Sequence, residues 1–117
     1  MLLCIEDFIA QGEPRQIVTV NPEFVMEARR DPQFRAIINN AALALPDGVG
    51  LLWAGRMLGQ PLRERVTGSD GVPRIAQRAA AKGWRLFLLG AAAGVAQEAA
   101  RKLEGRYTSL EVVGTFA

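Results

Sequence analysis

The segment RQIVTVNP, residues 15–22, decides the first part of the fold. Its β-branched residues are typical of a short buried strand, which we place at Arg15–Val20. Asn21-Pro22 follows at once, and it supplies a helix N-cap with proline at the first helical position. We expect this helix to have one or two turns. A strand followed directly by a helix is the repeating unit of an alternating β/α chain.

The flanking segments continue this alternation. Leu2–Ala10 has the pattern of an amphipathic helix, and Asp31-Pro32 repeats the cap and proline of Asn21-Pro22. The remaining predicted elements are strand 43–45, helix 49–58, helix 69–82, strand 84–89, helix 95–104 and strand 110–116. In helix 95–104, the side chains expected to face inward are Val95, Ala96, Ala99, Ala100 and Leu103. Strands alternating with helices predict an α/β fold, a Rossmann-like and mostly parallel sheet with helices on both faces.

The last strand has no helix after it, and the chain begins as abruptly as it ends. We therefore expect residues 1–117 to form a single α/β domain that is incomplete, with its C-terminal half absent.

Composition excludes several classes of function. The chain is 50% hydrophobic, and its net charge of +2 is spread along the sequence, so no basic stripe for nucleic acid is present. It has no histidine, which excludes histidine catalysis and histidine-ligated metals within this segment. Its single cysteine, Cys4, forms no internal disulfide, and a reducing cytoplasm fits that usage. No apolar run has the length of a membrane span.

Asp47 is the central candidate for catalysis. It follows strand 43–45 within Pro46-Asp47-Gly48, and ligands of α/β folds bind beyond the carboxyl ends of parallel strands. A carboxylate there can act as the general base that takes a proton from an attacking hydroxyl. An aspartate before a helix is also a common N-cap, and spacing alone favours that structural role.

Other polar groups have similar alternatives. Thr19 and Asn21 end the first strand and offer a hydroxyl and an amide for a bound ligand, or else serve as an ordinary strand residue and a helix cap. Arg65 lies in the polar loop 62–68, and the sequence pattern alone fits a solvated loop residue. The turn from Gly90 to Gly94 precedes a helix N-terminus, which suits a phosphate or ribose, although tight packing explains it equally well.

Four stretches together carry a family resemblance. They are TVNPEFV at 19–25, PDGVG at 46–50, PL-x-ERVTGSD at 61–70, and FLLG at 87–90 continued by GVA at 94–96. In this order and spacing, over nearly the whole chain, they resemble the WecG/TagA/CpsF family of bacterial cell-surface glycosyltransferases.

The resemblance implies a reaction. Such an enzyme moves an N-acetylmannosamine-type sugar from a UDP donor to an undecaprenyl-diphosphate-linked N-acetylglucosamine acceptor, in cell-surface polysaccharide or teichoic acid synthesis. Asp47 would be the base of an inverting transfer, Thr19 and Asn21 would contact substrate, and Arg65 would lie in the active site. The chain has no Asp-x-Asp motif, so we expect neither a metal nor another cofactor. Departing UDP would then be stabilised by arginine or helix N-termini.

The resemblance also implies a location. Family members are longer than this chain and would work in the cytoplasm, peripheral to the inner face of the cell membrane, docking through a basic C-terminal part.

The apolar stripe of residues 51–53 and 57–58 is either core or part of a homo-oligomer contact.

The sequence departs from the family pattern at Ala42, Gly71 and Ala91–Ala93, and the last departure weakens a phosphate role for that turn. The alternative function is a non-catalytic nucleotide-binding α/β module or an inactive fragment. A dinucleotide oxidoreductase is less supported, because its glycine fingerprint is absent.

Overall fold

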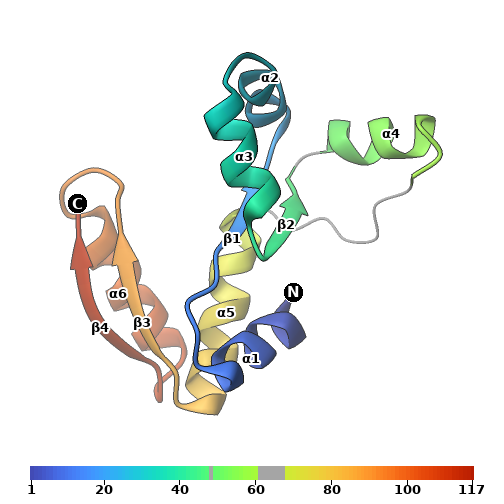
Figure 1. The fold of residues 1–117 in the computed structure, drawn as a ribbon. Coiled ribbons are helices and arrows are strands. Elements are labelled where there is room, and N and C mark those ends of the chain that lie inside the picture. The colour runs from blue at the N-terminus through green and yellow to red at the C-terminus, as the bar shows by residue number, and fades with distance from the viewer. Residues whose placement is uncertain (48, 61–67) are drawn as a thin grey trace. The chain divides into compact units, whose positions relative to one another are not determined.

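The computed structural model describes residues 1–47, 49–60 and 68–117 (Figure 1). These residues form two compact units, which are described separately. Unit 1 comprises Met1 and Leu3–Asp70, and unit 2 comprises Leu2 and Gly71–Ala117.

Unit 1 combines helices with one pair of strands. Its elements are α1 (Leu2–Gln11), β1 (Ile17–Val20), α2 (Pro22–Arg30), α3 (Pro32–Asn40), β2 (Leu43–Pro46) and α4 (Val49–Met57). Each matches an element expected from the sequence. Gly12 ends α1 in the left-handed conformation, with φ of 74°, which glycine adopts without steric cost.

The two proline-started helices form as their caps predict. The Asn21 carboxamide oxygen accepts a hydrogen bond from the Phe24 N–H at 2.8 Å. The Asp31 carboxylate accepts from the N–H groups of Gln33 and Phe34, while its own N–H donates to the Glu27 carbonyl. One residue therefore ends α2 and begins α3. At nine residues, α2 is longer than the one or two turns expected.

Two aromatic rings join these helices. The Phe24 and Phe34 rings meet edge to face, with centroids 5.5 Å apart and planes at 82°. This geometry is the one preferred by aromatic pairs.

Strands β1 and β2 are parallel. Ile17 pairs with Leu43 at one end and Val20 with Pro46 at the other. In this register the carboxyl ends of the two strands lie side by side, so the residues that follow the strands lie at one edge.

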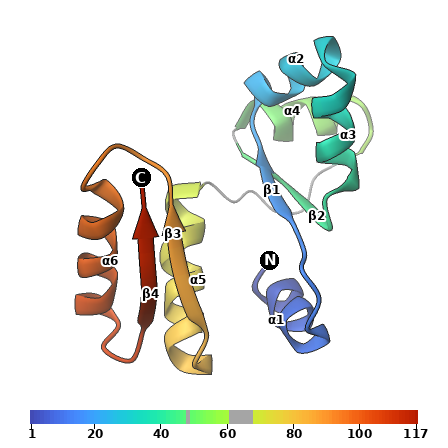
Figure 2. The same ribbon diagram turned by 60° about the vertical axis from the view of Figure 1, so that its left-hand side comes forward.

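Unit 2 contains α5 (Gly68–Lys82), β3 (Arg85–Leu89), α6 (Val95–Arg106) and β4 (Glu111–Phe116), with the first three residues of α5 grouped with unit 1. Helices α5 and α6 lie beside the parallel pair β3–β4 (Figure 2), and both pack against the face that carries Leu86 and Val112. Ala76, Ala79 and Leu110 form its buried core, against which Trp84, Leu86, Leu103, Tyr107 and Val112 pack. Alanines at the helix positions allow helix and sheet to approach closely.

The other face of the β3–β4 pair is open. Phe87, Leu89, Val113 and Phe116 are between 51% and 77% exposed. The register shifts between Leu86 and Phe87, so that Phe87 pairs with Gly114. A Cβ on Gly114 would lie 2.7 Å from the Phe87 ring, and only glycine leaves room for that ring.

One inward residue was assigned wrongly. Val95 was expected to face the core, but it is 50% exposed, while Ala96 and Ala100 of α6 are buried. Val95 is the first residue of α6, and its predicted inward face began one residue too early.

The structure confirms an α/β chain with small parallel sheets. The single Rossmann-like sheet and the single domain stay predictions.

Candidate active site

The carboxyl edge of the β1–β2 pair brings two of the sequence-predicted residues together. Val20 and Pro46 are register partners, so Asn21 and Asp47 are the next residues on adjacent strands. The Asp47 N–H extends the pairing, donating to the Val20 carbonyl at 2.7 Å. Thr19 pairs with Leu45 one position earlier. Residues far apart in the sequence are thus fixed at one edge by main-chain hydrogen bonds.

Asn21 has the structural role considered for it, since its carboxamide oxygen caps α2. The cap uses only the oxygen of that amide. Its Nδ2 group is a donor of the kind that binds a hydroxyl or carbonyl oxygen, so capping and substrate contact are compatible.

Asp47 is half-buried and directly follows β2. Helix α4 begins two residues later, at Val49. An ionised carboxylate only accepts hydrogen bonds, which suits it to take a proton from a bound hydroxyl.

The first turns of α2 and α4 lie against each other at this edge. A Cβ placed on Gly50 would be in ordinary contact with the Pro22 side chain, 3.6 Å from its Cγ. Helix N-termini carry partial positive charge, so two of them at one edge favour an anion or a carboxylate there.

Arg65 and most of its loop lie outside the described residues. Its predicted place in the site stays a prediction.

The turn from Gly90 to Gly94 lies in unit 2, after β3. Gly90 has φ of 106° and Gly94 of 85°, while Ala91 has the unusual value of 66°. A side chain in that left-handed region costs about 1 kcal/mol or more. The Gly90 N–H donates to the Phe116 carbonyl at 2.7 Å, which supports the structural role of this residue.

Gly94 is the N-cap residue of α6 and lines a pocket of about 560 Å³. The other lining residues are Ala93, Val95, Glu98, Ala99 and Lys102. Glu98 accepts a hydrogen bond from Arg101 at 3.0 Å, and this bond holds the pKa of the Glu98 carboxyl below its ordinary value. The pocket therefore combines a helix N-terminus and a lysine, which favour phosphate, with a carboxylate, which opposes it.

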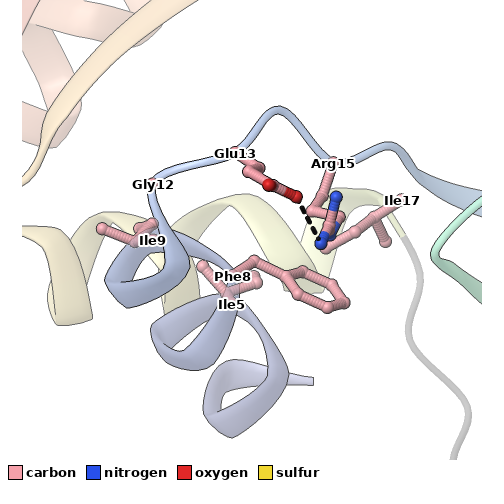
Figure 3. Close-up of a pocket in the computed structure, with 7 residues that line it drawn as sticks. All are labelled: Ile5, Phe8, Ile9, Gly12, Glu13, Arg15 and Ile17. Carbon is pink, nitrogen blue, oxygen red and sulfur yellow. Dashed lines mark ion pairs between the residues drawn. The ribbon is translucent and has the colours of Figure 1, made fainter.

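A second pocket lies along α1 and the chain leading into β1 (Figure 3). It measures about 220 Å³ and is lined by Ile5, Phe8, Ile9, Gly12, Glu13, Arg15 and Ile17. Arg15 and Glu13 form an ion pair at 3.0 Å beside its apolar side chains. None of the predicted site residues lines this pocket, which reaches the opposite end of β1 from Asn21.

A third pocket was not expected from the sequence. It measures about 230 Å³ and is lined by Val20, Ile38, Ala44, Leu45, Pro46 and Leu51. Leu51 belongs to the apolar stripe expected from the sequence, but periodicity alone does not show that such positions surround a hollow.

Within residues 1–47, 49–60 and 68–117, no cluster of three or more His, Cys, Asp or Glu side chains is arranged to hold a metal ion. No helix of these same residues has the length and apolar character needed to cross a membrane.

Comparison with known proteins gives a consistent result. A family model described as "Glycosyl transferase WecG/TagA/CpsF family" matches residues 1–117. Three relatives share the name N-acetylglucosaminyldiphosphoundecaprenol N-acetyl-beta-D-mannosaminyltransferase. The Bacillus spizizenii and Bacillus subtilis proteins are 32% and 30% identical over 107 residues, covering 92% of this chain and 42% of each relative. A Staphylococcus aureus protein is 34% identical over 94 residues, covering 80% of this chain and 37% of its own length.

The chain therefore spans about two fifths of the length of the curated relatives it matches. The match over all 117 residues agrees with the four motifs and with the parallel α/β architecture. The chain belongs to the WecG/TagA/CpsF family of glycosyltransferases.

Proposed function

We propose that this chain carries part of the active site of a transferase that moves an N-acetylmannosamine-type sugar from UDP to a polyprenyl-diphosphate-linked N-acetylglucosamine. The observation that carries the proposal is the pairing of Asp47 with Val20, which fixes Asp47 beside Asn21. The names of the three relatives support the choice of transferred sugar and acceptor.

Asp47 is the base in this proposal. Its carboxylate takes the proton of the acceptor hydroxyl while that oxygen bonds to the anomeric carbon of the donor sugar. The bond from that carbon to the UDP oxygen breaks with inversion, and UDP leaves with the bonding electrons. Thr19 and Asn21 hold sugar hydroxyls during the transfer.

The charge on departing UDP needs a counterpart. In a metal-independent reaction this role falls to Arg65 and to helix N-termini, which stabilise anions through their N–H groups. The N-termini of α2 and α4 support this role at the carboxyl edge of β1–β2. We assign Gly90 and Gly94 a weaker role in nucleotide binding, supported by the pocket at Gly94.

The finer architecture belongs to the same proposal. Two parallel strand pairs joined through helices support one Rossmann-like sheet, in a domain that the full length of the relatives would complete. A lipid-linked acceptor implies work at the cytoplasmic side of a membrane. The open face of β3–β4 supports self-association, because exposed apolar sheet surfaces tend to associate.

A non-catalytic nucleotide-binding module is the second candidate. The pocket beside Gly94 favours it, because nucleotide binding there would not require Asp47.

The test is a transfer assay with UDP-N-acetylmannosamine and a lipid-linked N-acetylglucosamine diphosphate, with and without EDTA. In a full-length version of the protein, Asp47→Ala is expected to lower the rate by about a hundredfold or more, while the fold is kept. Asp7→Ala removes an exposed carboxylate from α1 and serves as the matched control. Equal rates for Asp47→Ala and Asp7→Ala would remove Asp47 from the mechanism. A strict need for added magnesium or manganese would overturn the metal-independent reaction.

A further inference from the structure

The apolar pocket of about 230 Å³ in unit 1 lies beside the proposed catalytic edge. Two of its lining residues, Val20 and Pro46, are the last residues of β1 and β2 and are register partners. The next residues along the chain are Asn21 and Asp47. An apolar hollow therefore directly adjoins a polar edge.

The walls of the pocket come from four elements. Strands β1 and β2 contribute the sheet side, α3 contributes Ile38 and α4 contributes Leu51. Leu45 is 5% exposed, which makes it the most buried side chain of this wall. All six lining side chains are apolar, so a bound group must present carbon rather than a charge or a hydroxyl.

The size of the pocket limits what it can hold. The hollow is open to solvent, and its volume of about 230 Å³ has room for a substituent of several heavy atoms against the apolar wall. The ligand should therefore have a compact apolar group attached to a polar frame.

We propose that this pocket receives the methyl end of a sugar's acetamido group, with Ala44 and Leu51 setting the specificity for N-acetylated sugars. The inference rests on the proposed function, and it names the part of the substrate that the apolar side of the same site selects. The amide of that group remains at the polar edge, where the Asn21 Nδ2 is a suitable donor.

Either sugar of the proposed reaction supplies this chemistry. The donor and the acceptor both carry an acetamido group, and the two sources require separate arms of the test. Free N-acetylmannosamine represents the donor sugar, and free N-acetylglucosamine represents the acceptor sugar.

The experiment is saturation-transfer NMR of the 117-residue chain with each free N-acetylated sugar. Mannose and glucose, which lack the acetamido group, are the control ligands. The acetyl methyl of one N-acetylated sugar should receive the strongest saturation, and that sugar identifies the source. Ala44→Leu fills the pocket from β2 and should reduce this signal by about tenfold or more. Ala36→Leu adds the same carbons to an exposed position of α3 and should leave the signal unchanged.

A second variant that fills the pocket provides a control for unfolding of unit 1. Leu51→Phe narrows the pocket from α4, and an unchanged amide fingerprint shows that unit 1 is intact. Acetyl-methyl saturation that is absent in the wild type, or unchanged in both filling variants, overturns the inference. The readout requires no catalysis, so a chain that binds the acetyl group but transfers no sugar contradicts the proposed function alone.

Discussion

The β1–β2 pair and the β3–β4 pair are both parallel, but they differ in what surrounds them. Of the buried apolar side chains in the described residues, Leu45 belongs to unit 1 and the rest belong to unit 2. Unit 1 instead holds Thr19, Asn21 and Asp47 at or just beyond its strand ends. Unit 2 holds the buried core, whereas unit 1 holds most of the candidate chemistry.

This difference shows how the two requirements of an enzyme can be separated within one short chain. Side chains that bind a substrate must remain accessible, and the elements that carry them then bury less apolar surface. In unit 1, helix caps and main-chain pairing position the polar groups, while in unit 2 close helix-on-sheet packing provides the stability.

The largest expected effect on this contrast comes from replacing one leucine in each unit. Leu110→Ala should lower the free energy of unfolding of unit 2 by about 2–5 kcal/mol, because Leu110 packs in a closed cluster with Ala76 and Ala79. Leu45→Ala should cost less, because Leu45 already borders a hollow and loses fewer contacts. Native-state hydrogen exchange of the β4 and β2 amides measures both. Equal losses would mean that unit 1 is packed as tightly as unit 2.

A second test concerns the open face of unit 2. Gly114→Ala forces the Phe87 ring to move, because the added Cβ would lie 2.7 Å from Phe87 Cε2. We expect a loss of about 1 kcal/mol, the low end for overpacking, since the exposed ring can swing outward. Thermal unfolding measures this loss. In a Phe87→Leu background the same substitution should cost less, and an unchanged cost would show that the ring is not the obstacle.

The two helix caps of unit 1 allow a matched comparison, because removing either cap should lower the stability by a similar amount. Asn21→Ala and Asp31→Ala each remove a helix cap and should each cost about 1 kcal/mol in urea unfolding. Only Asn21→Ala should also lower the rate of sugar transfer, because only Asn21 lies beside Asp47. If both variants transfer sugar at the same rate, Asn21 is only a cap.

The smallest expected effect is a dependence of stability on pH in unit 2. The hydrogen bond from Arg101 lowers the pKa of Glu98 below its ordinary value of 4.5. A carboxyl with a lowered folded pKa contributes stability above its unfolded pKa and loses that contribution as pH falls through the folded value. Glu98→Gln should therefore be slightly less stable than the wild type at neutral pH, and the difference should shrink as pH falls below 4.5 and through the lowered pKa of folded Glu98.

Thermal unfolding between neutral and acid pH measures the Glu98 effect. Glu104→Gln, an exposed carboxyl on the same helix, is the control. The effect should be small because Glu98 and Arg101 are both exposed to solvent. A difference that grows toward low pH would have the wrong sign for this ion pair.

The sequence predicted the order of elements well, because their boundaries depend on local chemistry. Asn21-Pro22 and Asp31-Pro32 began helices as expected, and Gly12 ended one. The juxtaposition of Asn21 and Asp47 was also predictable, since parallel strands end at a common edge. The length of α2 was not predictable, because Asp31 serves both as the C-cap of α2 and as the N-cap of α3.

Features that depend on distant contacts were not predictable. The pairing of Gly114 with Phe87 arises from a register shift, which no local pattern shows. The pocket between β1–β2 and the helices that carry Ile38 and Leu51 depends on how well side chains from four elements fill space. Apolar periodicity predicts which side faces the interior, but not whether that interior is full.

The two tryptophans are distributed one to each unit, which has a practical consequence. Trp53 of α4 is 63% exposed, whereas Trp84 packs against the core of unit 2. Each is an intrinsic fluorophore in a different environment, and emission depends on exposure to water. In a Trp53→Phe chain the remaining emission reports on unit 2 alone, and in a Trp84→Phe chain it reports on unit 1. Each half of the molecule thus carries its own optical probe of folding and of ligand binding.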